Sequence, residues 1–258
     1  MPLSDSQKAH IKTILKGKII DKLANYECET SSMPFLAKIM QDSKQVAAYS
    51  FIHSMATTLG MSVYEQVSKI IAAPHFDIAE TSYDVIGTIS NEENTVISNI
   101  IQEIKNGRRA ADKGREIREI LACNSTTGNR HKVRADLFLK KGTQEYYIEI
   151  KTAKPNIDVF SKSKQKLLEW VALRKRPITT ILAIPYNPYY PDPYSRFTMQ
   201  GYLDEEKELF VAEKYWELLG GQGAYTDLLK VFDEVGKEVK DKIQEKIRLV
   251  ADERMDVF

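Results

Sequence analysis

Two short segments of alternating polarity place the strongest constraint on how this 258-residue chain folds. Residues 133–139 and 145–151 each alternate with a period of two, which is the periodicity of a β-strand with two unlike faces. The residues Lys140-Lys141-Gly142-Thr143 between them are typical of a turn, so the pattern predicts a β-hairpin. One predicted face carries Val133, Ala135, Leu137, Leu139, Tyr146, Ile148 and Ile150, and the other carries Arg134, Asp136, Phe138, Tyr147, Glu149 and Lys151.

The register of this hairpin decides which polar side chains meet. With Gly142-Thr143 as a two-residue loop, Asp136 lies directly opposite Glu149. With Lys141-Gly142 as the loop, the two acids are diagonal neighbours. In both registers they share a face, and Lys151 follows on the same face. A three-residue loop would bury one acid among apolar residues, and the alternation argues against it.

Helical periodicity dominates the rest of the chain, apart from a short apolar strand predicted at 178–184. Strands interleaved with helices indicate an α/β or α+β architecture. We predict a single domain over 1–258, with a mostly helical part at 1–125, a sheet core at 130–200 and a helical part at 201–258. The predicted helices are 1–26, 50–59, 62–73, 93–105, 110–122, 161–173, 208–219, 225–235 and 237–252.

Composition excludes several classes of protein. Apolar residues make up 43% and charged residues 28% of the chain, which is ordinary globular usage and excludes global disorder. No apolar run reaches the length of a membrane span. Cys28 and Cys123 are the only cysteines, which excludes a disulfide scaffold and a clustered zinc site. Because the first helix is amphipathic and is not a signal peptide, we expect a cytoplasmic protein.

The net charge is only +1, but the charge is unevenly distributed. Residues 105–134 contain nine basic and three acidic residues, and 162–176 contain six basic and one acidic. From 203 to the end, fifteen acids face nine bases. Basic charge in the middle of the chain suits a polyanionic partner. The alternative is that these residues are solvated faces of helices.

The hairpin carries a set of groups that suits metal-assisted hydrolysis. Like charges across a strand pair destabilise it, and a divalent cation between Asp136 and Glu149 would relieve that repulsion. Two carboxylates that leave room for water suit Mg²⁺. Lys151 beside them can position the attacking water and stabilise the developing anion. The competing interpretation is a solvent-facing hairpin on which these three residues form surface ion pairs.

The spacing of Asp136, twelve further residues and then Glu149-Ile150-Lys151 resembles the motif of the PD-(D/E)xK nuclease superfamily, with Ala135 in place of the motif's proline. Stretches at 149–156, 184–189, 197–201 and 215–221 are similar to type II restriction endonucleases, and more narrowly to the small group that cuts GGNCC. The resemblance implies that Asp136 and Glu149 hold Mg²⁺, with the backbone carbonyl of Ile150 as a further ligand. It implies that Lys151 assists hydrolysis.

The resemblance also implies a restriction-endonuclease-like core, in which a central mixed sheet is flanked by helices. It implies a homodimer that cuts double-stranded DNA at a palindromic site and leaves 5′-phosphates. A prokaryotic host should then carry a matching DNA methyltransferase as a functional partner. A third acid often precedes the hairpin, and Glu65 fits that place best, with Glu93 as second choice. The segment from Ser62 to Glu65 also fits a helix capping box.

Candidate DNA contacts lie on both sides of the second half of the sheet core. Lys154, Asn156, Lys162 and Lys164, together with Lys166, are candidates for phosphate contacts. Base contacts are expected from a Pro- and Tyr-rich loop whose polar residues are Asn187, Asp192, Arg196 and Gln200. Each assignment has an alternative. Lys154 and Asn156 fit an ordinary turn, and the three lysines from 162 to 166 fit a solvated helix face. The four polar residues of the loop fit the ordinary polarity of loops.

Two other functions fit the same residues. A repair or junction-resolving nuclease of the same superfamily would read DNA shape instead of sequence. A non-catalytic DNA-binding module would use the hairpin charges only as ion pairs. Discrete fragments from linear duplex DNA favour the restriction enzyme, and cutting of branched or damaged DNA alone favours the repair nuclease. Metal titration separates the non-catalytic module, because no binding of Mg²⁺ or Ca²⁺ near Asp136 would support it.

Overall fold

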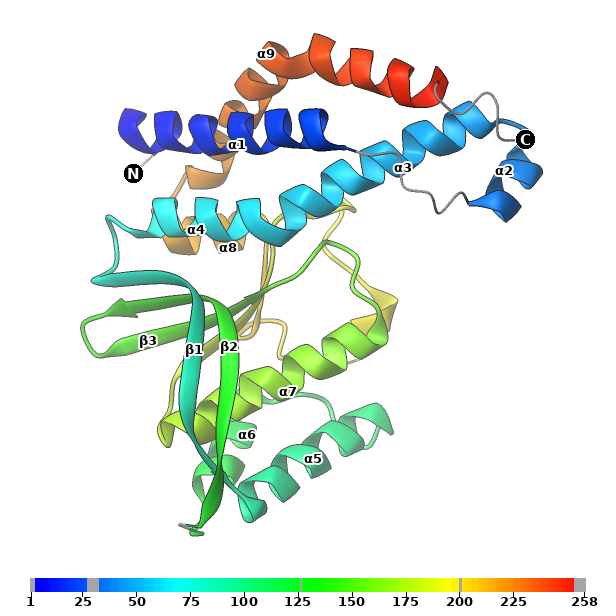
Figure 1. The fold of residues 1–258 in the computed structure, drawn as a ribbon. Coiled ribbons are helices and arrows are strands. Elements are labelled where there is room, and N and C mark those ends of the chain that lie inside the picture. The colour runs from blue at the N-terminus through cyan, green and yellow to red at the C-terminus, as the bar shows by residue number, and fades with distance from the viewer. Residues whose placement is uncertain (1–2, 27–32, 126, 200, 253–258) are drawn as a thin grey trace. The chain divides into compact units, whose positions relative to one another are not determined.

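The computed structural model describes residues 3–26, 33–125, 127–199 and 201–252 (Figure 1). Their contacts divide into two compact units. The first, here called the sheet unit, contains Ser68–Tyr225, and the second, the helical unit, contains Leu3–Val67 and the chain from Thr226 onward. The single domain predicted over 1–258 therefore stays a prediction.

The sheet unit is built on five strands in the order β1-β2-β3-β4-β5. The first three pair antiparallel, and β3, β4 and β5 pair parallel. This mixed sheet confirms the α/β class and the central mixed sheet predicted from the sequence. The strands are β1 (Ile78–Ser90), β2 (Gly128–Lys141), β3 (Gln144–Ile150), β4 (Thr179–Ile184) and β5 (Leu209–Val211).

Helix α7 (Ile157–Arg174) packs across the sheet and contacts β1 to β4 (Figure 1). Two shorter helices, α5 (Asn91–Lys105) and α6 (Lys113–Leu121), pack against α7. Aromatic rings fill the layer between α7 and the sheet, because Tyr147 of β3 contacts both Phe138 and Trp170. The unit ends with a short 3₁₀ turn at Phe197–Met199 and helix α8 (Glu213–Gly220), which contacts β5.

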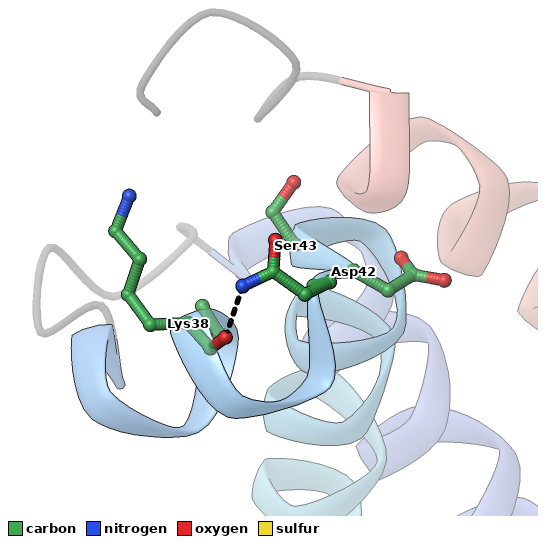
Figure 2. Close-up of a pocket in the computed structure, with 5 residues that line it drawn as sticks. Lys38, Asp42 and Ser43 are labelled. Carbon is green, nitrogen blue, oxygen red and sulfur yellow. Dashed lines mark hydrogen bonds between the residues drawn. The ribbon is translucent and has the colours of Figure 1, made fainter.

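The helical unit contains α1 (Asp5–Asn25), α2 (Pro34–Met40), α3 (Ser43–Thr58), a π-helical turn (Leu59–Val63) and most of α9 (Ala224–Asp252). Apolar residues of α3 and α9, with Tyr26 after α1, form one hydrophobic cluster of this unit. A pocket of about 270 Å³ lies where α2 meets α3, and Lys38, Asp42 and Ser43 line it (Figure 2). The Asp42 carboxylate there accepts a hydrogen bond from the N–H of Gln45, 3.0 Å away, and so caps α3.

Several elements differ from the sequence prediction. Strand β1 lies inside the part predicted to be mostly helical. Strand β5 occupies Leu209–Val211, within the helix predicted over 208–219, and α8 begins only at Glu213. The chain stays helical from Ser43 to Ala72, through Gly60, where a break was predicted. Helix α9 is continuous through Gly236, which was placed between two helices. One glycine inside a helix costs about 1 kcal/mol, and the packing of a long helix outweighs such a cost.

Among the described residues, no helix is both long enough and apolar enough to cross a membrane.

Candidate active site

Three of the predicted site residues meet at the end of β3. The Lys151 ammonium forms an ion pair with Oε1 of Glu149, and its Nζ lies 4.0 Å from Oδ2 of Asp136. Asp136 comes from β2, Glu149 from β3, and Lys151 directly follows β3. The predicted gathering of two carboxylates and one ammonium group is therefore present in the structure, while their chemical roles stay predictions.

The hairpin positions these groups in the first of the two predicted registers. Its pairs run from Lys141↔Gln144 to Leu137↔Ile148, with a two-residue turn between the strands. In this register Asp136 falls opposite Glu149, where the regular pairing stops. Beyond this point the Asp136 side chain takes the place of a backbone acceptor on β2. Its Oδ2 accepts a hydrogen bond from the backbone N–H of Ile150, 2.7 Å away.

The β1–β2 pairing is interrupted at the same place. It passes from Thr81↔Leu137 to Tyr83↔Ala135 and skips Ser82 and Asp136, and Ser82 has a φ of 53°. Ala135 and Phe138 enter one hydrophobic cluster, although strict alternation places them on opposite faces. The interruption thus turns the strand at Asp136 and brings its carboxylate towards the end of β3.

The charges and the burial around Asp136 shift the pKa of its carboxyl. Burial raises the pKa of the Asp136 carboxyl above its ordinary value, and the negative charge of Glu149 raises it further. The hydrogen bond from Ile150 and the charges of Lys151 and Lys166 act in the opposite direction and lower this pKa. The two carboxylates therefore repel each other, and the positive charges of Lys151 and Lys166 offset that repulsion.

A second lysine reaches the site from α7. The ammonium of Lys166 forms an ion pair with Oε2 of Glu149, so each oxygen of that carboxylate contacts a different lysine. Lys166 Nζ also lies 5.6 Å from the centre of the Trp170 ring, one helical turn further along. The Glu149 side chain is only 3% exposed. Sequence reasoning placed Lys166 only among candidate phosphate contacts and missed this pair.

Comparisons with known proteins identify the family of this chain. A model of the HinfI type II restriction endonuclease family matches residues 3–236. The chain belongs to this family. It is therefore a site-specific deoxyribonuclease, and the predicted resemblance to restriction endonucleases is confirmed.

Individual type II restriction enzymes are similar over most of the chain. HgiCII of Herpetosiphon aurantiacus is 29% identical over 234 residues, which cover 87% of this chain and 85% of HgiCII. HgiEI of the same organism is 27% identical over 206 residues, 76% of this chain and 75% of the relative. MjaII of Methanocaldococcus jannaschii is 25% identical over 285 residues, 97% of this chain and 75% of the relative.

One predicted DNA contact of this restriction endonuclease is wrong. Lys164 is fully buried, and its ammonium lies 2.5 Å from a carboxylate oxygen of Glu116 and 2.6 Å from one of Glu208. Residues two positions apart on a helix differ by about 200° in direction. Lys164 therefore faces the interior while Lys166 faces Glu149, and no DNA phosphate can reach Lys164.

The second choice for a third acid is also wrong. Glu93 completes a capping box with Ser90 at the start of α5 and forms an ion pair with Lys175. Ser90 pairs with Gly128, which precedes Asp136 by eight residues on β2. At about 3.3 Å per residue this separation is roughly 26 Å. Glu93 instead lines a pocket of about 410 Å³ together with Cys123 and Lys175.

The first choice, Glu65, lies in the first turn of α4 (Tyr64–Ala72), in the part of that helix that belongs to the helical unit. Its role as a third acid stays a prediction. Ser62 lies within the continuous helix, so the capping-box alternative is wrong. Within the described residues, no cluster of three or more His, Cys, Asp or Glu side chains suits a metal ion.

The residues that directly follow β3 form a turn and the start of a helix. Lys154 is exposed, and Asn156 is the N-cap of α7, with its Oδ1 accepting a hydrogen bond from the N–H of Val159, 2.9 Å away. Lys162 is exposed on the first turns of α7. Lys154 and Lys162 thus remain suited to phosphate contact, and part of the Asn156 amide is used by the fold.

The predicted base-reading loop is tied to the segment after β3. Nε of Arg196 donates a hydrogen bond to the carbonyl oxygen of Pro155, 3.3 Å away. Asn187 is used inside the loop, because its Nδ2 donates to the carbonyl oxygen of Asp192 at 2.8 Å. The side chain of Asp192 is exposed, and Gln200 lies outside the described residues. The loop is therefore anchored next to the site, while base contacts by these residues stay predictions.

Sequence reasoning missed a row of basic residues on β2. Arg130, Lys132 and Arg134 are exposed and share one side of the strand that leads to Asp136. Two of them, Lys132 and Arg134, form ion pairs of 3.0 Å with Asp84 of β1. Basic residues at every second position before the motif acid are the sequence signal that would have found this row.

Proposed function

We propose that this restriction endonuclease hydrolyses phosphodiester bonds of double-stranded DNA with Mg²⁺ and leaves 5′-phosphates. Asp136 and Glu149 are the metal ligands in this proposal, with the backbone carbonyl of Ile150 as a third, and Lys151 serves the attacking water. The observation that supports it is the meeting of these side chains at the end of β3, in a chain of this family.

The donor set fits a hard divalent cation. Carboxylate oxygens are the ligands that Mg²⁺ prefers, and two protein acids leave positions for water and for a substrate phosphate. Burial raises the pKa of the Asp136 carboxyl most, and the negative charge of Glu149 raises it further, so positive charge beside these two acids is favourable. When bound, such an ion lowers the pKa of a water ligand and stabilises negative charge on the phosphoryl oxygens.

The chain's own groups supply orientation and charge. The N–H of Ile150 fixes the Asp136 carboxylate by a direct hydrogen bond. The Lys151 ammonium lies within 4.0 Å of that carboxylate and is a third exposed, so it can reach both a water and a DNA phosphate. A fixed positive charge at that position stabilises the pentacovalent anion that develops during attack. Glu65 would complete the site as a third acid.

The surrounding surface supports binding of the DNA backbone. Arg130, Lys132 and Arg134 extend along β2 from Asp136, and Lys154 and Lys162 are exposed beyond β3. We assign these residues to phosphate contacts, and Asn187, Asp192, Arg196 and Gln200 to base contacts. The enzyme acts in this proposal as a homodimer in the cytoplasm of a prokaryote, because two-fold symmetry places one active site on each strand. The proposed recognition sequence is GGNCC, and a methyltransferase of the same specificity protects the host.

Digestion of a plasmid tests the proposal. With Mg²⁺, purified protein should give discrete fragments from linear duplex DNA, and sequencing of their ends should reveal one recognition sequence with 5′-phosphates. Asp136→Ala should abolish cleavage while DNA binding persists. Asp21→Ala, an exposed aspartate of α1, is the matched control and should cut normally. Unchanged cutting by Asp136→Ala would reject the site, and cutting of branched DNA alone would favour a junction-resolving nuclease.

A further inference from the structure

The two lysines at Glu149 leave the site electrically balanced without any metal ion. Asp136 and Glu149 carry two negative charges, and Lys151 and Lys166 carry two positive charges within the same cluster. A divalent cation added to this set would bring the total to +2. The ion pair between Lys166 and Glu149 therefore competes with metal binding at the same carboxylate.

Lys166 differs from Lys151 in where it comes from and how it is held. Lys151 follows Glu149 on the same segment, whereas Lys166 belongs to α7 and reaches across to the strand. Its ammonium lies over Trp170, and its side chain is 28% exposed. It pairs with Oε2 of Glu149, whereas Lys151 pairs with Oε1.

The rotation of α7 that places Lys166 is fixed by buried contacts on two sides of the helix. On the side away from Lys166, Lys164 lies between Glu116 of α6 and Glu208, and none of the three is more than 1% exposed. On the same side as Lys166, the fully buried Trp170 donates from Nε1 to the carbonyl oxygen of Val133 at 3.3 Å. Because these contacts hold the helix, the position of Lys166 next to Glu149 is a built feature and not a chance surface pair.

We propose that Lys166 is a counter-cation for Glu149, which neutralises this carboxylate in the metal-free protein and must release its Oε2 before a divalent cation binds there. This inference rests on the proposed function, because it takes Glu149 as a metal ligand. Lys166 is thus a positioning residue that acts through Glu149. It lowers the affinity for metal in the absence of DNA and offsets the repulsion between the two acids in the metal-free protein.

Calorimetric titration of the DNA-free protein with Ca²⁺ tests this inference without using activity. Lys166→Met removes the charge and keeps an apolar stem against Trp170, and Lys166→Gln is measured in parallel. Both should bind Ca²⁺ at least about tenfold more tightly than the wild type, since a repelling charge next to the ion is gone. Lys166→Arg keeps the charge and should stay within about twofold of the wild type.

The matched control is Lys141→Gln, which removes one lysine at the far end of β2 and should also change Ca²⁺ affinity by no more than about twofold. Equal affinities of the wild type, Lys166→Met and Lys166→Gln would overturn the role of Lys166 and leave the metal site intact. If Asp136→Ala binds Ca²⁺ as well as the wild type, or if no variant binds it, the metal site itself fails and the inference with it.

Discussion

The carboxylate of Asp136 accepts a hydrogen bond from the backbone N–H of Ile150, 2.7 Å away, at the point where regular β2–β3 pairing has ended. The side chain of Asp136, the proposed metal ligand, thus completes the backbone hydrogen bonding of the sheet. The end of the β2–β3 pairing and the position of the Asp136 carboxylate are therefore one structural feature. Changes to the charge and to the hydrogen bonding of this residue can be separated by a conservative substitution.

Asp136→Asn should inactivate the enzyme without unfolding it. The amide oxygen can still accept from Ile150, so the strand end keeps its geometry, but the negative charge is lost. We expect kcat to fall by at least about 10³-fold, the scale seen when a key electrostatic group is removed. The melting temperature of the metal-free protein should stay equal or rise, because a carboxyl whose pKa is raised by burial and by Glu149 opposes folding when charged. Single-turnover cleavage and calorimetry measure both; a residual rate near that of the wild type would exclude Asp136 from the chemistry.

Lys164→Met should destabilise the fold strongly, in contrast to the exposed lysines of the same helix. Removal of the ammonium leaves the buried carboxylates of Glu116 and Glu208 without their partner. Breaking a buried ion pair on one side costs about 3–5 kcal/mol of unfolding free energy. Lys162→Met should change it by less than about 0.5 kcal/mol. Urea unfolding compares the two variants, and equal stabilities would contradict the buried network.

Lys113 gives the stability a specific pH dependence. Burial lowers the pKa of its ammonium from 10.5 to about 8 in the folded protein, against the opposing attraction of Glu208. Between these values the unfolded chain binds more protons than the folded one, so this residue makes stability rise as pH increases through the interval. The difference in unfolding free energy between wild type and Lys113→Met should therefore shift in favour of the wild type from pH 8 to pH 10. A constant difference across that range would contradict the lowered pKa.

The basic row on β2 should act on DNA affinity through salt. Each phosphate contact contributes about 0.9 to the slope of log affinity against log salt concentration. The double variant Arg130→Gln/Lys132→Gln should thus lose up to about two units of slope. Lys230→Gln, on α9, removes an exposed lysine of the helical unit and should leave the slope unchanged. Binding titrations at several salt concentrations measure this, and identical slopes would place the DNA elsewhere.

The hairpin was predicted from the local sequence pattern alone. Alternation with a period of two and a Gly-containing turn define the strands and their register, so the approach of Asp136, Glu149 and Lys151 followed from the sequence. Strand β1 was missed although Tyr83, Val85 and Ile89 stand at odd-numbered positions of one strand face, because Ile86 and Gly87 interrupt the alternation and neighbouring helical segments dominated the interpretation of that half.

Contacts between elements distant in sequence were not predictable in the same way. The meeting of Lys166 with Glu149 depends on how α7 packs on the sheet, and no local pattern records that packing. The opposite directions of Lys164 and Lys166 follow from helix geometry alone, but which direction is buried depends on Glu116 and Glu208, which lie far away in sequence.

The most direct test is the anomalous scattering of Mn²⁺ in crystals of the protein bound to duplex DNA that contains its recognition sequence. We predict a peak about 2.1 Å from a carboxylate oxygen of Asp136 and from one of Glu149. The Lys166 ammonium should then have moved off the Glu149 carboxylate. A peak bound by other residues, or no peak at these two acids while DNA is cut in solution, would contradict the account.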